Sequence, residues 1–526
     1  MQRPIRRILL IQPPYNCAAH KTDLTPNPPL GLAYVAAVLE QFGFQVEILD
    51  AFVEGWDHES VTSPGIIRVG LPFEEIRHIV AEKAPDAVGI TAMFTSQRKN
   101  ASAVAALVKE VDPATFVIVG GAHATAAPEM ALSDPNVDLA VLGEGEDVIV
   151  PLLRALGNGE GLTGMQGVAY RAPDGSLVSN RRESAIVDLD AIPFPARHLL
   201  PMNKYFALPA RHGGLKVRTR PANIVASRGC PYRCNFCTAF KVFGRKARRR
   251  SVENILAELD ELVNRYQVNE LYFEDDQFLA NLSHAERLLD AMVERGYDLA
   301  WDTPNGISPW LLNDRLLGKM KASGCYHVNI AVESWSQWVL DNLIRKPVRV
   351  KRIPDLVRRI QDHGMAAGVF LVIGNIGPAG VETKEQIQES FRLLEQARPD
   401  TQHVSILTPY PGSQVLEVAL EKGYLVPGFD WDNLVIEKSN LQTPEWTPND
   451  LVDIRNKALV RIAFSSALKR PRKLFQLLWN ALRDDPLGFP ARVFRYGRKV
   501  MAAWLDTLRH RAGVRRQGKK LVKANR

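Results

Sequence analysis

Short apolar runs alternate with helical patterns over most of the first 425 residues, and this alternation limits the fold more than any other feature. Residues 8–150 contain apolar runs such as "ILLIQPP", "AVGITAMFTSQ" and "FVIVGGAHAT", separated by helical segments such as "LGLAYVAAVLEQFG". Continuous Val, Ile and Leu runs between helices are typical of a parallel sheet covered on both faces. The sequence therefore predicts a doubly wound, Rossmann-like α/β domain over residues 1–160.

The predicted strands of this domain end in small or polar residues, among them Thr91, Gly120, Gly121 and Gly143. In open α/β sheets, ligands bind at the carboxyl ends of the strands. We therefore expect a nucleotide-like or other large planar ligand at this edge; the alternative is that these residues form ordinary tight turns.

A second α/β region follows a stretch in which the alternation of strand and helix patterns is weaker. In residues 161–222, "RAPDGS" predicts a hairpin turn and "IPFPAR" a proline-rich connector, so we expect a linker between domains. Over residues 223–425 six successive β/α units predict a partial parallel (β/α)6 barrel with its working end at the strand carboxyl termini. The remaining residues, 426–526, are predicted to be helical and to end in a basic tail.

The basic residues are concentrated in that tail. Residues 466–526 hold 17 Lys and Arg against 3 Asp and Glu, so the formal net charge of +8 conceals a mildly acidic body of net charge −6. The tail helices place apolar residues on one face and Arg and Lys on the other, which predicts either packing on the barrel or contact with an anionic membrane surface. No apolar run has the length of a membrane-spanning helix. We expect a cytoplasmic protein, with peripheral contact at the inner face of the membrane as the alternative.

Three of the five cysteines lie close together. Cys230, Cys234 and Cys237 have the spacing C-x3-C-x2-C on a loop directly after the first strand of the second region, whereas Cys17 and Cys325 are far away in sequence. Three thiolates are one short of the four that close a structural zinc or ordinary iron–sulfur site. The spacing favours a cluster with one iron open to a substrate or cofactor; a zinc site and a buried trio of thiols are the alternatives.

This motif, with Phe236 directly before its last cysteine, resembles the signature of radical SAM enzymes. The first domain is similar to the cobalamin-binding domain of one subgroup in "PPLGLAYVAAVLEQFGFQVEILDA", "GGAHAT" and "LGEGE". The chain thus resembles the cobalamin-dependent radical SAM methyltransferases. The resemblance implies that Cys230, Cys234 and Cys237 hold a 4Fe-4S cluster whose open iron binds S-adenosylmethionine, and that the first domain binds cobalamin.

The resemblance also implies an activity and partners. The expected reaction methylates an unactivated carbon or phosphorus of a small molecule, natural product or lipid through methylcobalamin and a 5'-deoxyadenosyl radical. A non-methylating enzyme of the same class, forming or contracting a ring or cyclising a tetrapyrrole or lipid, is the alternative. A reductant such as flavodoxin or ferredoxin is an expected partner, and nucleic acid is not. The sequence assigns no catalytic residue beyond the groups that bind the cofactors.

For S-adenosylmethionine the resemblance points to residues at barrel strand ends: Phe236, Glu274, Asp275, Glu333, Ser334 and Asn375. Carboxylates suit an ammonium group, although acids at strand ends also serve as helix caps. The run "GRKARRRS", residues 244–251, is predicted to contact the carboxylate or phosphate of a cofactor or substrate; a solvated surface and a nucleic-acid patch are the alternatives.

For cobalamin the resemblance points to Gly120, Gly121, His123, Gly143, Glu144, Gly145 and Glu146. The sequence lacks the pattern Asp-x-His-x-x-Gly, in which a histidine ligates cobalt, so we expect cobalamin to be held without a protein histidine. Glycines let a nucleotide tail approach the backbone closely. His123 is expected to contact cobalamin or, alternatively, to be a loop histidine with partners inside the protein.

Overall fold

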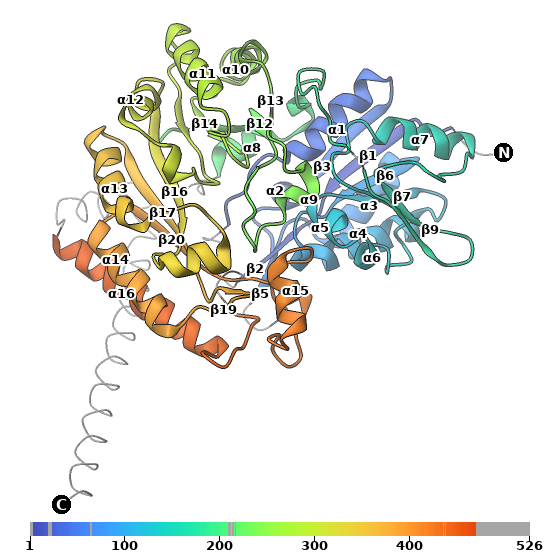
Figure 1. The fold of residues 1–526 in the computed structure, drawn as a ribbon. Helices are drawn as coiled ribbons and strands as arrows, with labels where there is room; N and C mark the ends of the chain where they lie inside the picture. Colours follow the sequence, from blue (N-terminus) through green and yellow to red (C-terminus); the bar gives the residue numbers. More distant parts are fainter. Residues whose placement is uncertain are drawn as a thin grey trace, which may run out of the picture.

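The computed structural model describes residues 4–469 except 19–23, 64–65, 183, 209–211, 213–214, 216, 435 and 437. Two α/β units lie side by side in Figure 1: an N-terminal unit in blue to teal and a second unit in green to orange. The expected order of a doubly wound domain followed by a parallel partial barrel is confirmed.

The N-terminal unit is built on a seven-stranded sheet of order β10-β9-β8-β7-β6-β1-β3. Its five parallel strands are β1 (Arg7–Gln12), β3 (Gln45–Asp50), β6 (Ala87–Thr91), β7 (Phe116–Gly120) and β8 (Leu139–Val141). Helices α1 (Leu30–Gln41), α3 (Phe73–Lys83), α4 (Arg98–Val111) and α7 (Ile149–Asn158) cover the sheet. The strand order reverses between β1 and β6, which is where such sheets open a crevice for ligands.

The predicted linker contributes two strands to this sheet. β9 (Val168–Arg171) and β10 (Leu177–Asn180) form the hairpin expected from "RAPDGS", and β9 pairs antiparallel with β8. Val168 and Ala169 are fully buried there, so the hairpin belongs to the core of the first unit and only the chain after it connects the two units. A small sheet of β2 (Tyr15–Ala18), β5 (Ile66–Val69) and β4 (Glu59–Ser63), which the sequence did not predict, lies beside it.

The second unit is a six-stranded, fully parallel sheet in sequential order. Its strands are β11 (Pro221–Ile224), β14 (Glu270–Phe273), β15 (Ala300–Asp302), β16 (Cys325–Glu333), β17 (Ala366–Ile373) and β20 (Thr401–Ile406). Helices α10 (Val252–Tyr266), α11 (Leu282–Glu294), α12 (Asp314–Ala322), α13 (Ile353–Asp362), α14 (Lys384–Ala397) and α15 (Gln414–Glu421) follow the strands. Because β11 and β20 are both edge strands, the barrel is open, and one core buries the outward faces of the strands under the helices.

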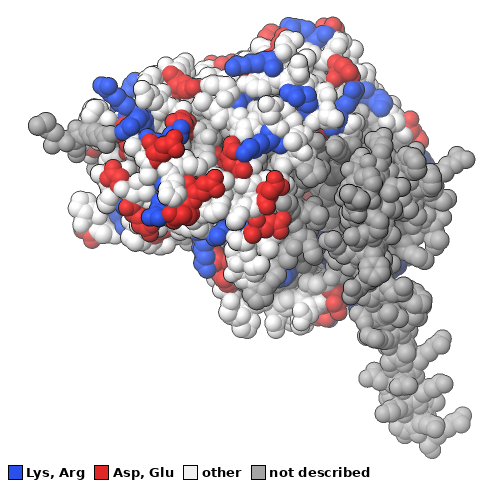
Figure 2. Space-filling model, turned by 180° about the vertical axis from the view of Figure 1, so that it is seen from behind, with Lys and Arg blue, Asp and Glu red and all other residues white. Residues whose placement is uncertain are grey.

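Helix α16 (Pro448–Lys469) follows the barrel and packs on α14 and β20. The predicted tail beyond it lies outside the described residues, so its packing and membrane contact stay predictions. None of the helices that the structure describes is long and apolar enough to cross a membrane. On the face seen in Figure 2, basic and acidic side chains are interspersed over the described surface.

Candidate active site

The three clustered cysteines lie in one loop between the two-residue strand β12 (Ser227–Arg228) and helix α9 (Ala239–Phe243). Cys230, Cys234 and Cys237 are half-buried free thiols. Burial raises the pKa of each of them, that of Cys234 to about 11, and the charge of one thiolate raises the pKa of another. Among the described residues, however, no set of three or more His, Cys, Asp or Glu side chains has converged into a metal site.

The chemistry of these donors fits an iron–sulfur cluster. At neutral pH thiols with raised pKa values stay protonated in the metal-free protein, and a coordinated metal stabilises the thiolate by displacing the proton. Three neighbouring thiols in a polar loop therefore suit a positively charged iron centre better than a dry core.

Asn235, between the second and third cysteines, holds the loop to three other segments. Its amide nitrogen donates to the carbonyl of Ile344 (3.3 Å), its side-chain Nδ2 donates to that of Ile376 (2.8 Å), and its own carbonyl accepts from the amide of Val415 (3.2 Å). Because Asn235 is buried, these bonds are protected from water and fix the loop on the barrel.

Asp275 and Asp276, just after β14, fix the same loop from the other side. Asp276 accepts a hydrogen bond from the amide of Gly229 (3.0 Å), while Asp275 accepts from the amide of Ala226 (3.1 Å) and the hydroxyl of Ser227. Burial raises the pKa of both carboxyls, that of Asp275 to about 7. The contacts of Asp275, expected at S-adenosylmethionine, are made with the strand that leads into the cysteine loop.

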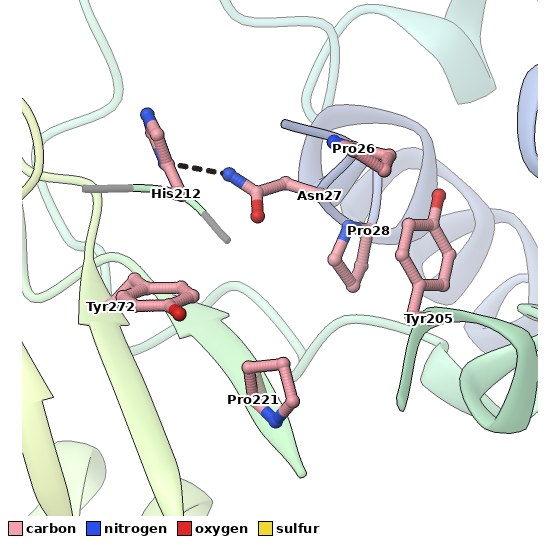
Figure 3. Close-up of a pocket in the computed structure, with 8 residues that line it drawn as sticks. Pro26, Asn27, Pro28, Tyr205, His212, Pro221 and Tyr272 are labelled. Atoms are coloured by element: carbon pink, nitrogen blue, oxygen red, sulfur yellow. Dashed lines mark hydrogen bonds between the residues drawn. The ribbon is translucent and has the colours of Figure 1, made fainter. Parts of the chain in front are cut away.

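Glu274 bonds to two residues that line the pocket drawn in Figure 3, His212 and Asn27. One of its oxygens lies 2.8 Å from Nδ1 of His212 and accepts from Nδ2 of Asn27 (3.1 Å), and the other accepts from Asn305 (3.1 Å). Figure 3 shows His212 and Asn27 above the ring of Tyr272, so residues of both units line this pocket. Burial lowers the pKa of His212, but the hydrogen bond and charge of Glu274 outweigh it, and the net shift is upward.

Glu333, at the end of β16, forms a buried ion pair. Its carboxylate lies 2.6 Å from Nζ of Lys346, and both side chains are at most 10% exposed. Glu333 has φ of +68°, in the left-handed region that non-glycine residues rarely adopt, at an irregularity in the pairing of β16 with β17. Lys346 is electrostatically coupled to Cys230 and Cys234, which places a fixed positive charge beside the cysteine loop.

Ser334 and Asn375 meet at a carboxylate that the sequence did not single out, Glu382. It accepts hydrogen bonds from the amides of Gly374 (2.9 Å) and Asn375 (3.0 Å), from Nδ2 of Asn375 (2.9 Å) and from the hydroxyl of Ser334 (3.4 Å). Burial raises the pKa of Glu382 to about 7. Oδ1 of Asn375 is buried without a hydrogen-bond partner among the described residues, and such an orphaned acceptor suits a ligand that donates a hydrogen bond.

Phe236 is half-buried and packs against the barrel core beside Cys234. Its place within the cysteine loop is compatible with the predicted contact with S-adenosylmethionine.

In the N-terminal unit, the strand ends give the expected glycines different surroundings. A Cβ on Gly120 would meet nothing within 4 Å, whereas on Gly121 (φ +103°) it would lie 2.8 Å from the carbonyl oxygen of Ala92. At Gly143 and Gly145 it would meet neighbouring protein atoms at 3.4 Å. Gly120 therefore faces open space at the carboxyl edge of the sheet, and Gly121 makes the tight turn beside it.

His123 is buried beside this turn. Its Nδ1 lies 3.1 Å from the hydroxyl of Thr95, and its Nε2 has no partner among the described residues. Burial and the charge of Arg98 lower the pKa of His123 to about 4, so the ring is neutral at pH 7. The neutral His123 ring therefore brings a buried nitrogen without a described partner close to the ligand edge of the sheet.

Sequence reasoning missed two apolar residues at the same edge. Met93 and Phe94 follow β6 and are 55% and 45% exposed. Large apolar side chains exposed at a strand end favour a large ligand with apolar faces. The signal was present in "TAMFTSQ", but a strand end rich in apolar residues is indistinguishable from a longer strand before the fold is known.

Glu144 and Glu146, which are predicted to contact cobalamin, bond to arginines of the barrel unit. Arg228 donates to Glu144 (2.9 Å) and to Glu146 (2.6 Å), and Arg248 donates to Glu144 (2.8 Å). Glu144 is 2% exposed and the two arginines 6% and 7%. Arg228 lies two residues before Cys230, so this buried charge cluster ties the ligand edge of the first sheet to the cysteine loop.

The same contacts revise the interpretation of the basic run 244–251. Arg248 bonds to Glu144, and Arg250 forms a buried ion pair with Glu258. Both arginines therefore have protein carboxylates as partners, Arg248 in the first unit and Arg250 within the barrel unit, whereas Lys246 and Arg249 are exposed.

Known protein families match the two α/β units separately. The B12 binding domain family matches residues 22–153, and the radical SAM superfamily matches residues 224–411. The first match covers four of the five parallel strands of the first sheet, β3, β6, β7 and β8, and the second runs from the end of β11 through the cysteine loop past the last barrel strand, β20.

Relatives and solved structures span both units. The chain is 32% identical over 481 residues to cytidylyl-2-hydroxyethylphosphonate methyltransferase of Streptomyces wedmorensis, covering 86% of this chain and 89% of that one. It is 26% identical to anaerobic magnesium-protoporphyrin IX monomethyl ester cyclase of Rubrivivax gelatinosus, covering 94% and 84%. The solved structure of the cobalamin-dependent S-adenosylmethionine radical enzyme OxsB matches 95% of this chain and 72% of its own, with a TM-score of 0.68 at 15% identity.

Proposed function

Because this chain belongs to the cobalamin-dependent radical SAM methyltransferases, we propose that it methylates an unactivated carbon or phosphorus centre of a small organic substrate held between its two α/β units. One observation carries the proposal: the loop that bears the three cysteines is bonded through Arg228 to the ligand edge of the first sheet. Two cofactor sites that meet across one interface suit a reaction that needs both cofactors at one substrate atom.

The protein's part in this reaction is to bind, orient and exclude water, since the cofactors carry the difficult chemistry. When bound, the cluster with S-adenosylmethionine supplies hydrogen-atom abstraction and cobalamin supplies methyl transfer. We assign Cys230, Cys234 and Cys237 to the cluster. Asn235 and Asp276 hold the loop in place through the buried hydrogen bonds described above.

For S-adenosylmethionine we propose two polar groups: one has no partner in the described part of the chain, and the other is a partly buried carboxylate that bonds to His212, Asn27 and Asn305. Oδ1 of Asn375 is a buried acceptor without a partner among the described residues, and Glu274 is a carboxylate of 16% exposure. Acceptors of this kind suit an ammonium or hydroxyl group of the ligand. Glu333 and Asp275 have protein partners, so we assign them to positioning of the site, with Phe236 and Ser334 beside it.

For cobalamin we propose the edge formed by Gly120, Gly121 and His123, with Met93 and Phe94 as its apolar floor. The open space at Gly120 and the exposed rings and thioether beside it support a large flat ligand. The neutral His123 ring has one unpartnered nitrogen within this edge, which suits a hydrogen bond to the ligand. We assign Glu144 and Glu146 to the interface with the barrel instead.

The substrate is proposed as a small molecule. The Streptomyces relative carries a phosphonate compound in its name, and the Rubrivivax relative a porphyrin ester. The second relative supports one other activity, an oxidative cyclisation without methyl transfer. Its lower identity makes it the runner-up.

Anaerobic reconstitution with iron, sulfide and cobalamin, followed by product analysis with S-adenosylmethionine, a reductant and candidate substrates, tests the proposal. Methylation requires both 5'-deoxyadenosine and S-adenosylhomocysteine to form together with the methylated product. Deoxyadenosine alone supports the cyclase-like alternative. If the protein takes up iron equally well when Cys230, Cys234 and Cys237 are replaced by Ala, the assignment of the cluster is refuted.

A further inference from the structure

We propose that exposed basic residues around the cysteine loop form a docking surface for an acidic electron-transfer protein. The donor-docking surface consists of Arg233, Arg345, Arg349, Lys351 and Arg352, all of which are exposed. The inference rests on the proposed function, because cleavage of S-adenosylmethionine at the cluster consumes one electron that must come from outside the active site. In the docking step one electron passes from the reduced donor to the oxidised cluster, and no bond is made or broken.

The donor-docking surface is continuous with the loop that binds the cluster. Arg233 directly precedes Cys234, and the hydrogen bond from the amide of Asn235 to the carbonyl of Ile344 joins this loop to the segment that begins at Arg345. The cysteines themselves are only half-buried. A partner on this surface would therefore approach the cluster through one loop rather than through the barrel wall.

Lys346, the residue after Arg345, is a buried cation close enough to Cys230 and Cys234 for their charges to raise its pKa. It is 7% exposed and forms its ion pair with Glu333 inside the protein, while its neighbours Arg345 and Pro347 are exposed. Net charge beside an iron–sulfur cluster is one of the factors that set its reduction potential. Glu333 balances the charge of Lys346, so the pair adds a local cation beside the cluster site and no net charge to the docking surface.

The charge of the segment is unbalanced. Residues 345–352 contain five Lys and Arg and no acidic residue. Within the described part of the chain, the only ion pair to a carboxylate on the docking surface itself is that of Arg349 with Asp341, at 3.4 Å between two exposed side chains. Because the body of the protein is acidic overall, a basic patch gives an acidic partner one favoured orientation. Steering of this kind raises association rates by about 10-fold to 1,000-fold and weakens with salt.

The test reverses three of these charges. Arg345→Glu, Arg349→Glu and Lys351→Glu are combined in one variant, and a control variant reverses three exposed cations elsewhere: Arg154→Glu on α7, Arg287→Glu on α11 and Lys457→Glu on α16. The probe is a purified acidic flavodoxin. Its dissociation constant is measured by calorimetry at low and high salt, and reduction of the reconstituted cluster is followed by stopped-flow absorbance with reduced flavodoxin and, separately, with dithionite.

We expect the docking variant to bind flavodoxin and to be reduced by it at least about 10-fold less well than wild type at low salt. The control variant should match wild type, wild-type binding should weaken as salt rises, and dithionite should reduce all three proteins alike. Equal binding and reduction of the docking variant and wild type by flavodoxin would overturn the proposal. Failure of dithionite to change the absorbance of wild type would instead refute the cluster, and the docking inference with it.

Discussion

The buried charge cluster between the two units should stabilise the protein even without its cofactors, and this distinguishes a structural role of Glu144 from a contact with a cofactor. Glu144 accepts from Arg228, Arg248 and the amide of Ile186. We expect Glu144→Gln, which keeps the shape of the side chain, to lower the free energy of unfolding of the cofactor-free protein. The reason is that two guanidinium groups, 6% and 7% exposed, would lose their shared carboxylate.

The expected loss in free energy of unfolding depends on the hydrogen-bond partners that each arginine keeps in Glu144→Gln. Arg228 keeps Glu146 at 2.6 Å, but Arg248 keeps only the carbonyls of Ile186 and Phe243. Removing one partner of a buried ion pair costs about 3–5 kcal/mol, and the remaining contacts place Glu144→Gln near the lower end, at about 3 kcal/mol. Arg248→Met should cost a similar amount, and the double variant should fall short of the sum by about 1–3 kcal/mol because both single changes break one interaction.

Urea unfolding followed by tryptophan fluorescence measures these differences, with the transitions of the two units fitted separately. The control is Asp298→Asn, which removes the 84%-exposed partner of Arg218 and should leave the transition unchanged. Wild-type stability of Glu144→Gln, or simple additivity with Arg248→Met, would refute the reasoning. Unchanged stability with weaker cobalamin binding would restore the original expectation that Glu144 contacts the cofactor.

Three further outcomes follow from single residues. Lys346→Met leaves Glu333 buried and unpaired, so iron content after reconstitution should fall and the midpoint potential of any remaining cluster should become more negative. Lys346→Arg should stay closer to wild type in both iron content and midpoint potential. Equal potentials in wild type and the two variants would contradict this. Phe94→Ser should weaken cobalamin binding about 10-fold or more, since an aromatic side chain loses about 2 kcal/mol of burial against the ligand, and should leave unfolding of the cofactor-free protein unchanged because the ring is exposed there. Burial raises the pKa of Asp50 from 3.8 to about 6. Between pH 3.8 and about 6 the folded protein therefore binds more protons than the unfolded chain, so the free energy of unfolding of wild type should fall as pH rises through this interval. In Asp50→Asn this dependence on pH should be weaker.

Much of the fold followed from the sequence because the apolar runs of both units are long enough to be buried on two faces. The runs that end at Gln12, Thr91 and Gly120 are the central strands of the first sheet. The hairpin of β9 and β10 was predicted as a turn but not as part of that sheet. Its pairing with β8 depends on which strand edge is left free, and local patterns carry no information about that.

The cysteine loop was predictable for a different reason. Three cysteines at short, fixed spacing indicate a shared metal site even before the fold is known, whereas an isolated lysine or glutamate indicates no particular role. Lys346 and Glu382 carry no such spacing. They became visible only when the fold brought Lys346 to Glu333 and brought Glu382 to Asn375.

The binding partners of acidic residues at strand ends could not be predicted from the sequence. The sequence places Glu144, Asp275, Glu274 and Glu333 at equivalent positions, and a ligand cation or a protein donor would satisfy any of them equally well. The structure separates them by burial, because a carboxylate removed from water needs its partner inside the fold. Glu144 finds two arginines, Asp275 the strand before the cysteines, and Glu333 a lysine. Glu274 finds His212 and Asn27, but it is only partly buried and both partners line a pocket between the units. A substitution at Glu274 should therefore alter cofactor binding more than stability, the reverse of the result expected for Glu144.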